Sequence, residues 1–193
     1  MPYSLKKLFG KPGFVIDEYI AGKRVNHFRP ISMVIVLATI YAMIYHLLNL
    51  NDRPTLDQSS ELIVEKVFEH YYWFVVATIP IYALTTFIMF KKTGYNFFFE
   101  FIIFEAFKTS QSLVVHILFL PVLYFFKDRS VFNTISHLLL VLDFILILWI
   151  NKQFFKNLSL SQVLIKSLAS YLMYLILSLI LIVIIIILFG LDR

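Results

Sequence analysis

The chain has 193 residues, of which 60% are hydrophobic and only 15% are charged, whereas soluble domains carry about 25% charged residues. Its apolar residues come in blocks of about 20, the length that crosses a bilayer, which excludes a soluble fold. The absence of cysteine excludes disulfides, thiolate metal sites and cysteine nucleophiles. The net charge of +5 comes from basic residues beside the apolar blocks, a distribution typical of topology determinants, which argues against nucleic acid as a partner.

The first 30 residues form a basic segment without the early apolar core of a secretory signal. Residues 14–21 have the length of two helical turns, and one side of this stretch is apolar, with Phe14 and Tyr19 among its members. We expect a short amphipathic helix in the headgroup region; a simple basic topology anchor is the alternative interpretation. Six basic side chains accompany it: Lys6, Lys7, Lys11, Lys23, Arg24 and Arg29.

Two apolar blocks in the first half of the chain predict membrane-spanning helices. The first covers residues 31–50, which at 1.5 Å per residue can cross a hydrocarbon core of about 30 Å. A helical pattern then begins at Ser60 outside the bilayer and continues into the second span, residues 71–90. This span opens with three aromatic residues, as expected at a membrane interface, and Pro80 predicts a kink near its middle.

A central aromatic stretch is apolar along most of its length but contains charged side chains. Glu100, Glu105 and Lys108 fall close together in it, a density of charge that is costly in hydrocarbon. We therefore expect residues 95–108 to lie at the interface or in a shallow re-entrant segment, and residues 109–126 to form the third span. The carboxylates of Glu100 and Glu105 are about 140° apart around a helix, which is unfavourable for a paired acid–base site. We expect them to be interfacial charges that extend toward water.

The last third of the chain predicts two more spans, at residues 131–150 and 167–189, preceded by a short turn at residues 127–130. A polar connector with three lysines separates the two spans. Residues 181–188 are almost entirely leucine and isoleucine and predict a lipid-facing surface. The first half of the fifth span has a small or polar residue at every fourth position, which predicts a packing face formed by Ser170, Tyr174 and Ser178.

Lysine and arginine counts predict how the chain is threaded. With five spans, the segments on the side of the amino terminus carry 12 of these residues and the opposite segments carry five. Because positive charge accumulates in cytoplasmic segments, the amino terminus is expected in the cytoplasm. Docking of residues 14–20 against residues 95–107 would form one aromatic layer on that side. We expect the layer to contact anionic headgroups or a partner helix through Phe14, Tyr19, Lys23, Arg24, Lys91 and Lys92.

Ionisable groups inside predicted spans are candidate functional residues. Asp143 and His116 stand out, because each lies about seven residues from the cytoplasmic end of its span, at a depth of roughly 10 Å. We expect the two side chains to touch. Three interpretations stay open at this point: a hydrogen bond that fixes helix register, a proton or transport function, or no contact. The remaining intramembrane polar candidates are Glu100, Glu105, His46 and His137.

Two stretches carry a resemblance to a known family. The run from Pro12 to Arg24, followed by Pro30, resembles the opening of the bacterial membrane proteins of domain of unknown function 3667. The segment at residues 95–100 resembles the family's central motif, although Phe101 stands where a histidine is expected, and the zinc ribbon of many members is missing. The resemblance implies a multi-pass protein of the bacterial inner membrane, and the five spans and basic counts above then predict a periplasmic carboxyl terminus. It implies no activity, because the family has none assigned.

The expected fold is an all-α membrane bundle of about five transmembrane helices plus interfacial amphipathic helices, divided into residues 1–30 and 31–193. No Walker loop, G-x-S-x-G, HExxH or G-x-G-x-x-G motif occurs, so we predict no catalytic residue, metal site or cofactor. We favour a non-enzymatic assembly or regulatory component that binds lipid or a partner protein. The alternative is a small oligomeric transporter or channel that uses Asp143 and His116.

Overall fold

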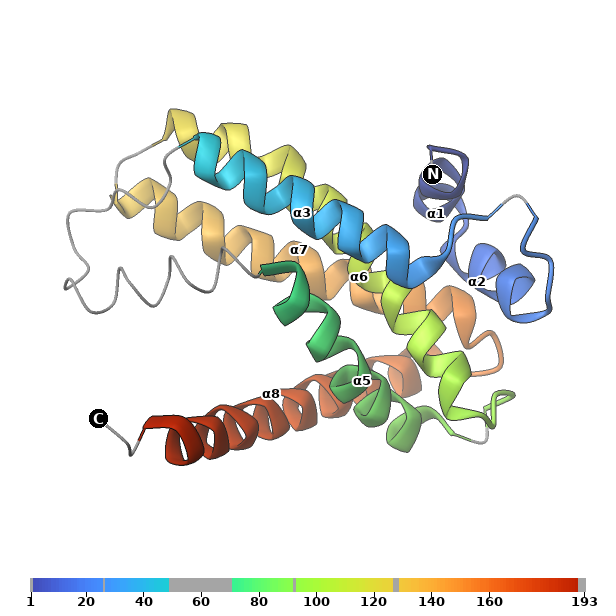
Figure 1. Cartoon of the computed structure of the whole chain (residues 1–193). Coiled ribbons are helices and arrows are strands. Elements are labelled where there is room, and N and C mark those ends of the chain that lie inside the picture. Colours follow the sequence, from blue (N-terminus) through green and yellow to red (C-terminus); the bar gives the residue numbers. More distant parts are fainter. Residues whose placement is uncertain (1, 26, 49–70, 92, 127–128, 191–193) are drawn as a thin grey trace.

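The computed structural model describes residues 2–25, 27–48, 71–91, 93–126 and 129–190, and all regular secondary structure in them is helical. Figure 1 shows the helices in chain order: α1 (Pro2–Gly10), α2 (Pro12–Ile20), α3 (Pro30–Leu47), α5 (Tyr71–Phe90), α6 (Phe98–Phe125), α7 (Arg129–Phe154) and α8 (Leu160–Gly190). The predicted helix start at Ser60, the prediction for Lys92 and the side chains that follow Leu181 lie outside the described part.

Five of these helices are long and apolar enough to cross a membrane. They are α3, α5, α6, residues Thr134–Phe154 of α7 and residues Leu160–Leu181 of α8. The expected all-α fold with five apolar spans is therefore confirmed, and by helix length and composition the chain is a multi-pass membrane protein. The second span agrees with its predicted end at residue 90, and its described part begins at Tyr71.

The central stretch differs from the prediction. We expected an interfacial or re-entrant segment over residues 95–108, but α6 is one continuous helix of 28 residues that begins at Phe98. The carboxylate of Glu100 accepts hydrogen bonds from the backbone N–H groups of Asn96 and Phe97, both at 3.0 Å, and so caps the start of the helix. Because the charges further along are paired inside the protein, as described below, the helix does not have to break at Lys108.

The connector before the last span is also shorter than predicted. We expected polar chain over residues 151–166, but α7 continues to Phe154 and α8 begins at Leu160. The amide of Asn151 donates to the hydroxyl of Ser167 at 2.6 Å, so these two polar residues join the helices instead of forming a loop. Likewise, the predicted turn at residues 127–130 ends early, because α7 begins at Arg129.

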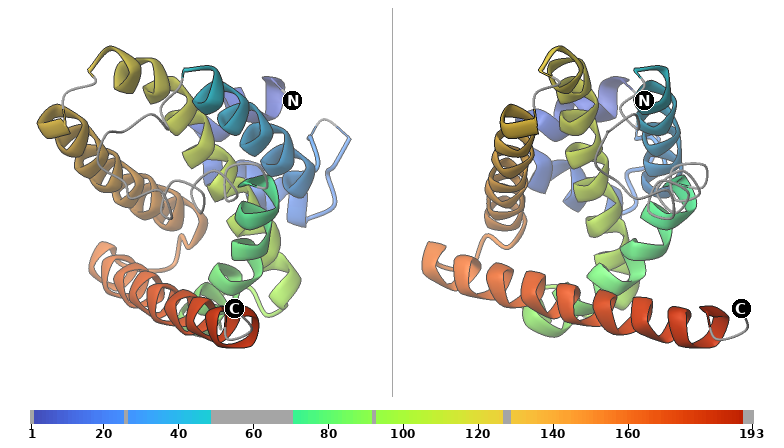
Figure 2. Two further views of the ribbon diagram at one scale, coloured as in Figure 1. Left: turned by 60° about the vertical axis from the view of Figure 1, so that its left-hand side comes forward. Right: turned by 90° about the vertical axis from the view of Figure 1, so that its left-hand side faces the viewer.

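The spans form two sets with different directions. Helix α3 packs along α6, and α5 packs against both α6 and α8. The right-hand view of Figure 2 shows that α8 runs crosswise to α3, α6 and α7. Lys166 Nζ donates to the backbone carbonyl of Met89 at 2.6 Å, which ties the beginning of α8 to the end of α5.

Two short helices cover one end of the bundle. Helix α1 was not predicted, and α2 begins at Pro12, slightly earlier than expected. Leu8, Val15 and Ile16 are completely buried in the main hydrophobic core. The ring of Tyr19 packs edge-on against Phe107 of α6, with 5.4 Å between centroids. The expected docking of this segment on the central stretch is therefore confirmed.

Candidate functional site

A cavity of about 530 Å³ lies between α5, α6, α7 and α8. Its walls are mostly apolar, with side chains such as Leu113, Phe144 and Leu168. Ten side chains of the lining carry a polar group, and they come from all four helices: Tyr71, Thr78, Tyr82, Lys108, Thr109, Ser112, His116, Asp143, Tyr171 and Tyr174. A pocket whose wall surface is mostly apolar, with polar groups that converge on it, is the usual form of a small-molecule site.

Asp143 and His116 meet on one wall of this cavity. The imidazole Nε2 lies 2.8 Å from Asp143 Oδ2, and the hydroxyl of Ser112 donates to Oδ1 at 2.6 Å. The predicted contact is confirmed. The side chains keep 28% and 22% of their surface exposed, so the pair is accessible from the cavity. A ring from α3, Tyr41, lies 6.4 Å from the imidazole centroid.

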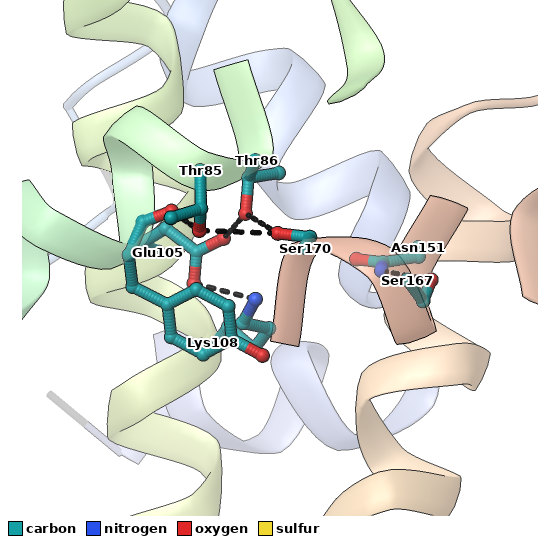
Figure 3. A network of polar contacts seen from close by, with 8 residues as sticks. Thr85, Thr86, Glu105, Lys108, Asn151, Ser167 and Ser170 are labelled. Carbon is teal, nitrogen blue, oxygen red and sulfur yellow. Dashed lines mark hydrogen bonds and ion pairs between the residues drawn. The ribbon is translucent and has the colours of Figure 1, made fainter. Parts of the chain in front are cut away.

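A second charged pair lies deeper in the protein (Figure 3). Lys108 Nζ is 2.5 Å from Glu105 Oε2, and both side chains are almost completely buried. Thr86 of α5 donates to Glu105 Oε1 at 2.6 Å, and the ammonium of Lys108 lies 3.9 Å from the centroid of the Tyr82 ring. We expected Glu105 to reach water from the interface, and this was wrong. The ammonium of Lys108 compensates its charge, the hydroxyl of Thr86 bonds to its second oxygen, and the Tyr82 ring stabilises the ammonium.

Helix α8 closes this network from the other side. Ser170 Oγ lies 3.2 Å from the hydroxyl of Thr85 and 3.1 Å from that of Thr86. Tyr174 stacks on Tyr82 with 4.6 Å between centroids. Two of the three residues of the predicted packing face therefore contact α5, as expected. The third, Ser178, donates to a carbonyl of its own helix instead.

Sequence reasoning missed the polar face of α6 that faces the cavity. Glu105, Lys108, Ser112 and His116 recur at intervals of three or four residues and therefore share one side of the helix. At 1.5 Å per residue the face is about 16 Å long, roughly half of a hydrocarbon core. The same spacing is visible in the sequence, but we had assigned its first half to the interface and its second half to a span.

The other expected site residues lie away from the cavity. Glu100 caps α6, while Lys23 lies 3.6 Å from Glu18 and Arg24 lies 5.3 Å from the centroid of Tyr19. Phe14 and Lys91 are exposed. The structure therefore separates the predicted residues into an intramembrane group around the cavity and a group at the end covered by α1 and α2.

Asp17 connects that end of the protein. It accepts hydrogen bonds from the hydroxyl of Tyr95 and from Lys156 Nζ, the latter at 2.6 Å. These contacts join α2 to the loop before α6 and to the connector before α8. Burial raises the pKa of Tyr95 well above its usual value, and the hydrogen bond to Asp17 raises it further.

Fold and cavity together define an α-helical, multi-pass membrane protein with a partly polar intramembrane pocket. The family model described as protein of unknown function DUF3667 matches residues 1–42, which form α1, α2 and most of α3. This is the family that the sequence resembles. The described residues that line the cavity all follow the matched segment in the chain, beginning with Tyr71. No curated protein and no solved structure matches the chain.

Proposed function

We propose that this chain is a non-enzymatic membrane protein that takes an amphipathic molecule from the bilayer and holds it in the cavity between α5, α6, α7 and α8. One observation carries the proposal: the cavity of about 530 Å³ has mostly apolar walls, and the partly exposed pair of His116 and Asp143 lies on one of them. An amphipathic molecule matches this division, because its apolar part fits the walls and its polar part can bond to the pair.

The contacts of the polar lining favour binding over catalysis. Ser112 donates to Asp143, and Lys108 is paired with Glu105. A serine nucleophile is usually activated by an imidazole. Ser112 donates instead to the carboxylate of Asp143, whose other oxygen bonds to His116; a carboxylate is the weaker base, and this arrangement suits a recognition site.

We place the protein in the bacterial inner membrane, with the amino terminus in the cytoplasm and the carboxyl terminus in the periplasm. The family resemblance supports the membrane, and the excess of lysine and arginine in the segments on the amino-terminal side supports the orientation. The layer formed by α1 and α2 then lies at the cytoplasmic surface. Its basic rim, with Lys23 and Arg24, suits anionic lipid headgroups.

Filling the cavity tests the binding function. Leu168 lines the cavity and is partly exposed, so Leu168→Trp adds bulk there, while Leu172→Trp places the same side chain one turn further along α8, outside the lining. Native mass spectrometry of protein released from membranes should detect a co-purified molecule in the parent and in Leu172→Trp, and much less of it in Leu168→Trp. Equal loading of both variants would contradict the proposal.

A second candidate is a small oligomeric carrier, which the accessibility of the His116–Asp143 pair favours. A carrier binds its ligand on one side of the membrane and releases it on the other, whereas a binding component does not move its ligand across. In proteoliposomes, flux of a bound molecule that disappears in Asp143→Asn at unchanged protein content would identify a carrier. Binding without flux would support the first candidate.

A further inference from the structure

We infer that the molecule held in the cavity is a lipophilic monocation, which binds beside the carboxylate of Asp143 in competition with a proton. This inference rests on the proposed function and names the class of ligand that the same site takes.

The charges of the lining carry the first step. Lys108 and Glu105 compensate each other at 2.5 Å. Among the described lining residues Asp143 and His116 remain, and with a neutral imidazole the carboxylate has no cation beside it. An uncompensated charge inside a membrane is costly. A proton taken up by the pair of His116 and Asp143 cancels this charge, and so does a bound cation.

The geometry around Asp143 leaves room for a cation. Each carboxylate oxygen accepts one hydrogen bond, from Ser112 or from His116, whereas a carboxylate offers about four acceptor positions. Tyr171 and Tyr174 line the same cavity, and cations bind favourably to aromatic faces. The position of Lys108 Nζ, 3.9 Å from the Tyr82 centroid, is an example of this contact within the same wall.

The charges of the described lining also disfavour binding of an anion. Lys108 is the lysine of the described lining, and its side chain is buried and already paired with Glu105. The other titratable groups of the described lining are phenols from α5 and α8, and α3 adds the phenol of Tyr41 next to His116. Phenols stay neutral between pH 5 and 8, so the pair of His116 and Asp143 determines how ligand binding depends on pH in this range.

Two ions of the same shape and opposite charge provide the test: tetraphenylphosphonium and tetraphenylborate, with neutral diphenylhexatriene as a third probe. Equilibrium binding to the purified full chain in nanodiscs is compared with empty nanodiscs. We expect one saturable phosphonium site per chain, at least tenfold tighter than any borate site. Its affinity should increase as the pH is raised from 5 to 8, with proton release on binding, because the cation and the proton compete.

Two variants separate the ligand class from the fold. Asp143→Asn keeps a hydrogen-bonding side chain and should weaken phosphonium binding at least tenfold. His116→Gln should retain binding with a changed pH dependence, because one of the two groups that can take the competing proton, the imidazole, is absent. Unchanged size-exclusion and circular dichroism profiles serve as the fold control, and Leu172→Trp should bind as the parent does.

The outcomes distinguish a failure of the cation inference from a failure of the proposed binding function. Borate or diphenylhexatriene binding that equals or exceeds phosphonium binding, and that Leu168→Trp abolishes, would overturn the cation while leaving the cavity as a binding site. Phosphonium binding that does not change with pH in the parent would likewise overturn the competition with a proton. If no probe binds and Leu168→Trp leaves co-purified material unchanged, the inference and the proposed function both fail.

Discussion

Glu105 and Lys108 are tolerated in the interior because each side chain provides the opposite charge that the other needs. Their charged atoms are 2.5 Å apart and have almost no contact with solvent. Removing one partner of such a pair leaves an uncompensated buried charge, which costs about 3–5 kcal/mol, whereas replacing both partners can be nearly neutral. The pair is therefore a requirement of this core more than a source of its stability.

This asymmetry gives a prediction for single and double variants. Lys108→Met should lower the free energy of unfolding by about 3 kcal/mol, because Glu105 then keeps only the hydrogen bond from Thr86. Lys108→Met combined with Glu105→Gln should recover most of the loss. Thermal unfolding in detergent, followed by circular dichroism, measures both effects. A single variant as stable as the parent would mean that the carboxylate finds another partner.

Asp143 gives a second prediction at this scale. Asp143→Asn should fold normally, since an amide can still bond to Ser112 and His116. Asp143→Leu would leave both partners without their acceptor, and should cost on the order of 1 kcal/mol, the scale of hydrogen bonds between membrane helices. Comparing the unfolding midpoints of the two variants checks this. Equal midpoints would show that the contact contributes little to stability.

At the scale of elements, the approach of α2 to α7 depends on a glycine. A Cβ atom at Gly13 would lie 2.4 Å from the backbone oxygen of Gln153, whereas one at Gly10 would meet nothing within 4 Å. Gly13→Ala should therefore push α2 away from α7 and cost about 1–3 kcal/mol, as overpacking usually does. Gly10→Ala is the matched control and should leave the unfolding temperature unchanged. Equal stability of the two variants would argue against this contact.

The contact between Tyr95 and Asp17 makes stability depend on alkaline pH. Since the pKa of Tyr95 is raised in the folded protein, mainly by burial, its neutral form stabilises the fold. That contribution is complete below the ordinary phenol pKa of about 10, and it is lost as the pH increases toward the folded value. Tyr95→Phe should therefore lose less stability than the parent between pH 9 and 11. The free energy of unfolding is measured for both proteins across this pH range, and an equal loss in the parent and in Tyr95→Phe would refute the prediction.

The elements that the sequence predicted well are those whose signal is local. Residues 71–90 have the length and apolarity of a span regardless of what packs on them. Helix α6 was divided wrongly because the partners that make its charges acceptable, such as Thr86, come from other helices. Helix α1 was missed because it is short and basic, and its helical form depends on the burial of Leu8 and on Ser4, whose hydroxyl accepts from the backbone N–H of Phe28.

The candidate site was predictable in one part only. Equal depth on neighbouring spans was enough to expect that His116 and Asp143 touch, because depth follows directly from helical rise. The cavity was not predictable, since it depends on how α8 crosses the other helices, as Figure 2 shows. Crossing angles arise from side-chain packing between helices, and one sequence does not specify which faces meet.

For the molecule as a whole, five apolar spans predict termini on opposite sides of the membrane. A periplasm-active reporter fused to the carboxyl terminus should be active, and a cytoplasm-active reporter at the same position should be silent. The excess of positive charge on the amino-terminal side is the physical reason. A cytoplasm-active carboxyl-terminal fusion would mean that an even number of spans crosses the membrane.

The order in which the helices are synthesised gives the spacing of Glu105 and Lys108 a further meaning. The two residues are three positions apart on one helix, so they can neutralise each other as soon as α6 forms. Ser170, which bonds to the neighbouring Thr86, is made much later. These two charges of α6 can therefore enter lipid already compensated by each other while the ribosome is still translating α8. A pair divided between two helices would instead expose two bare charges to the insertion machinery and to the lipid until both helices had arrived.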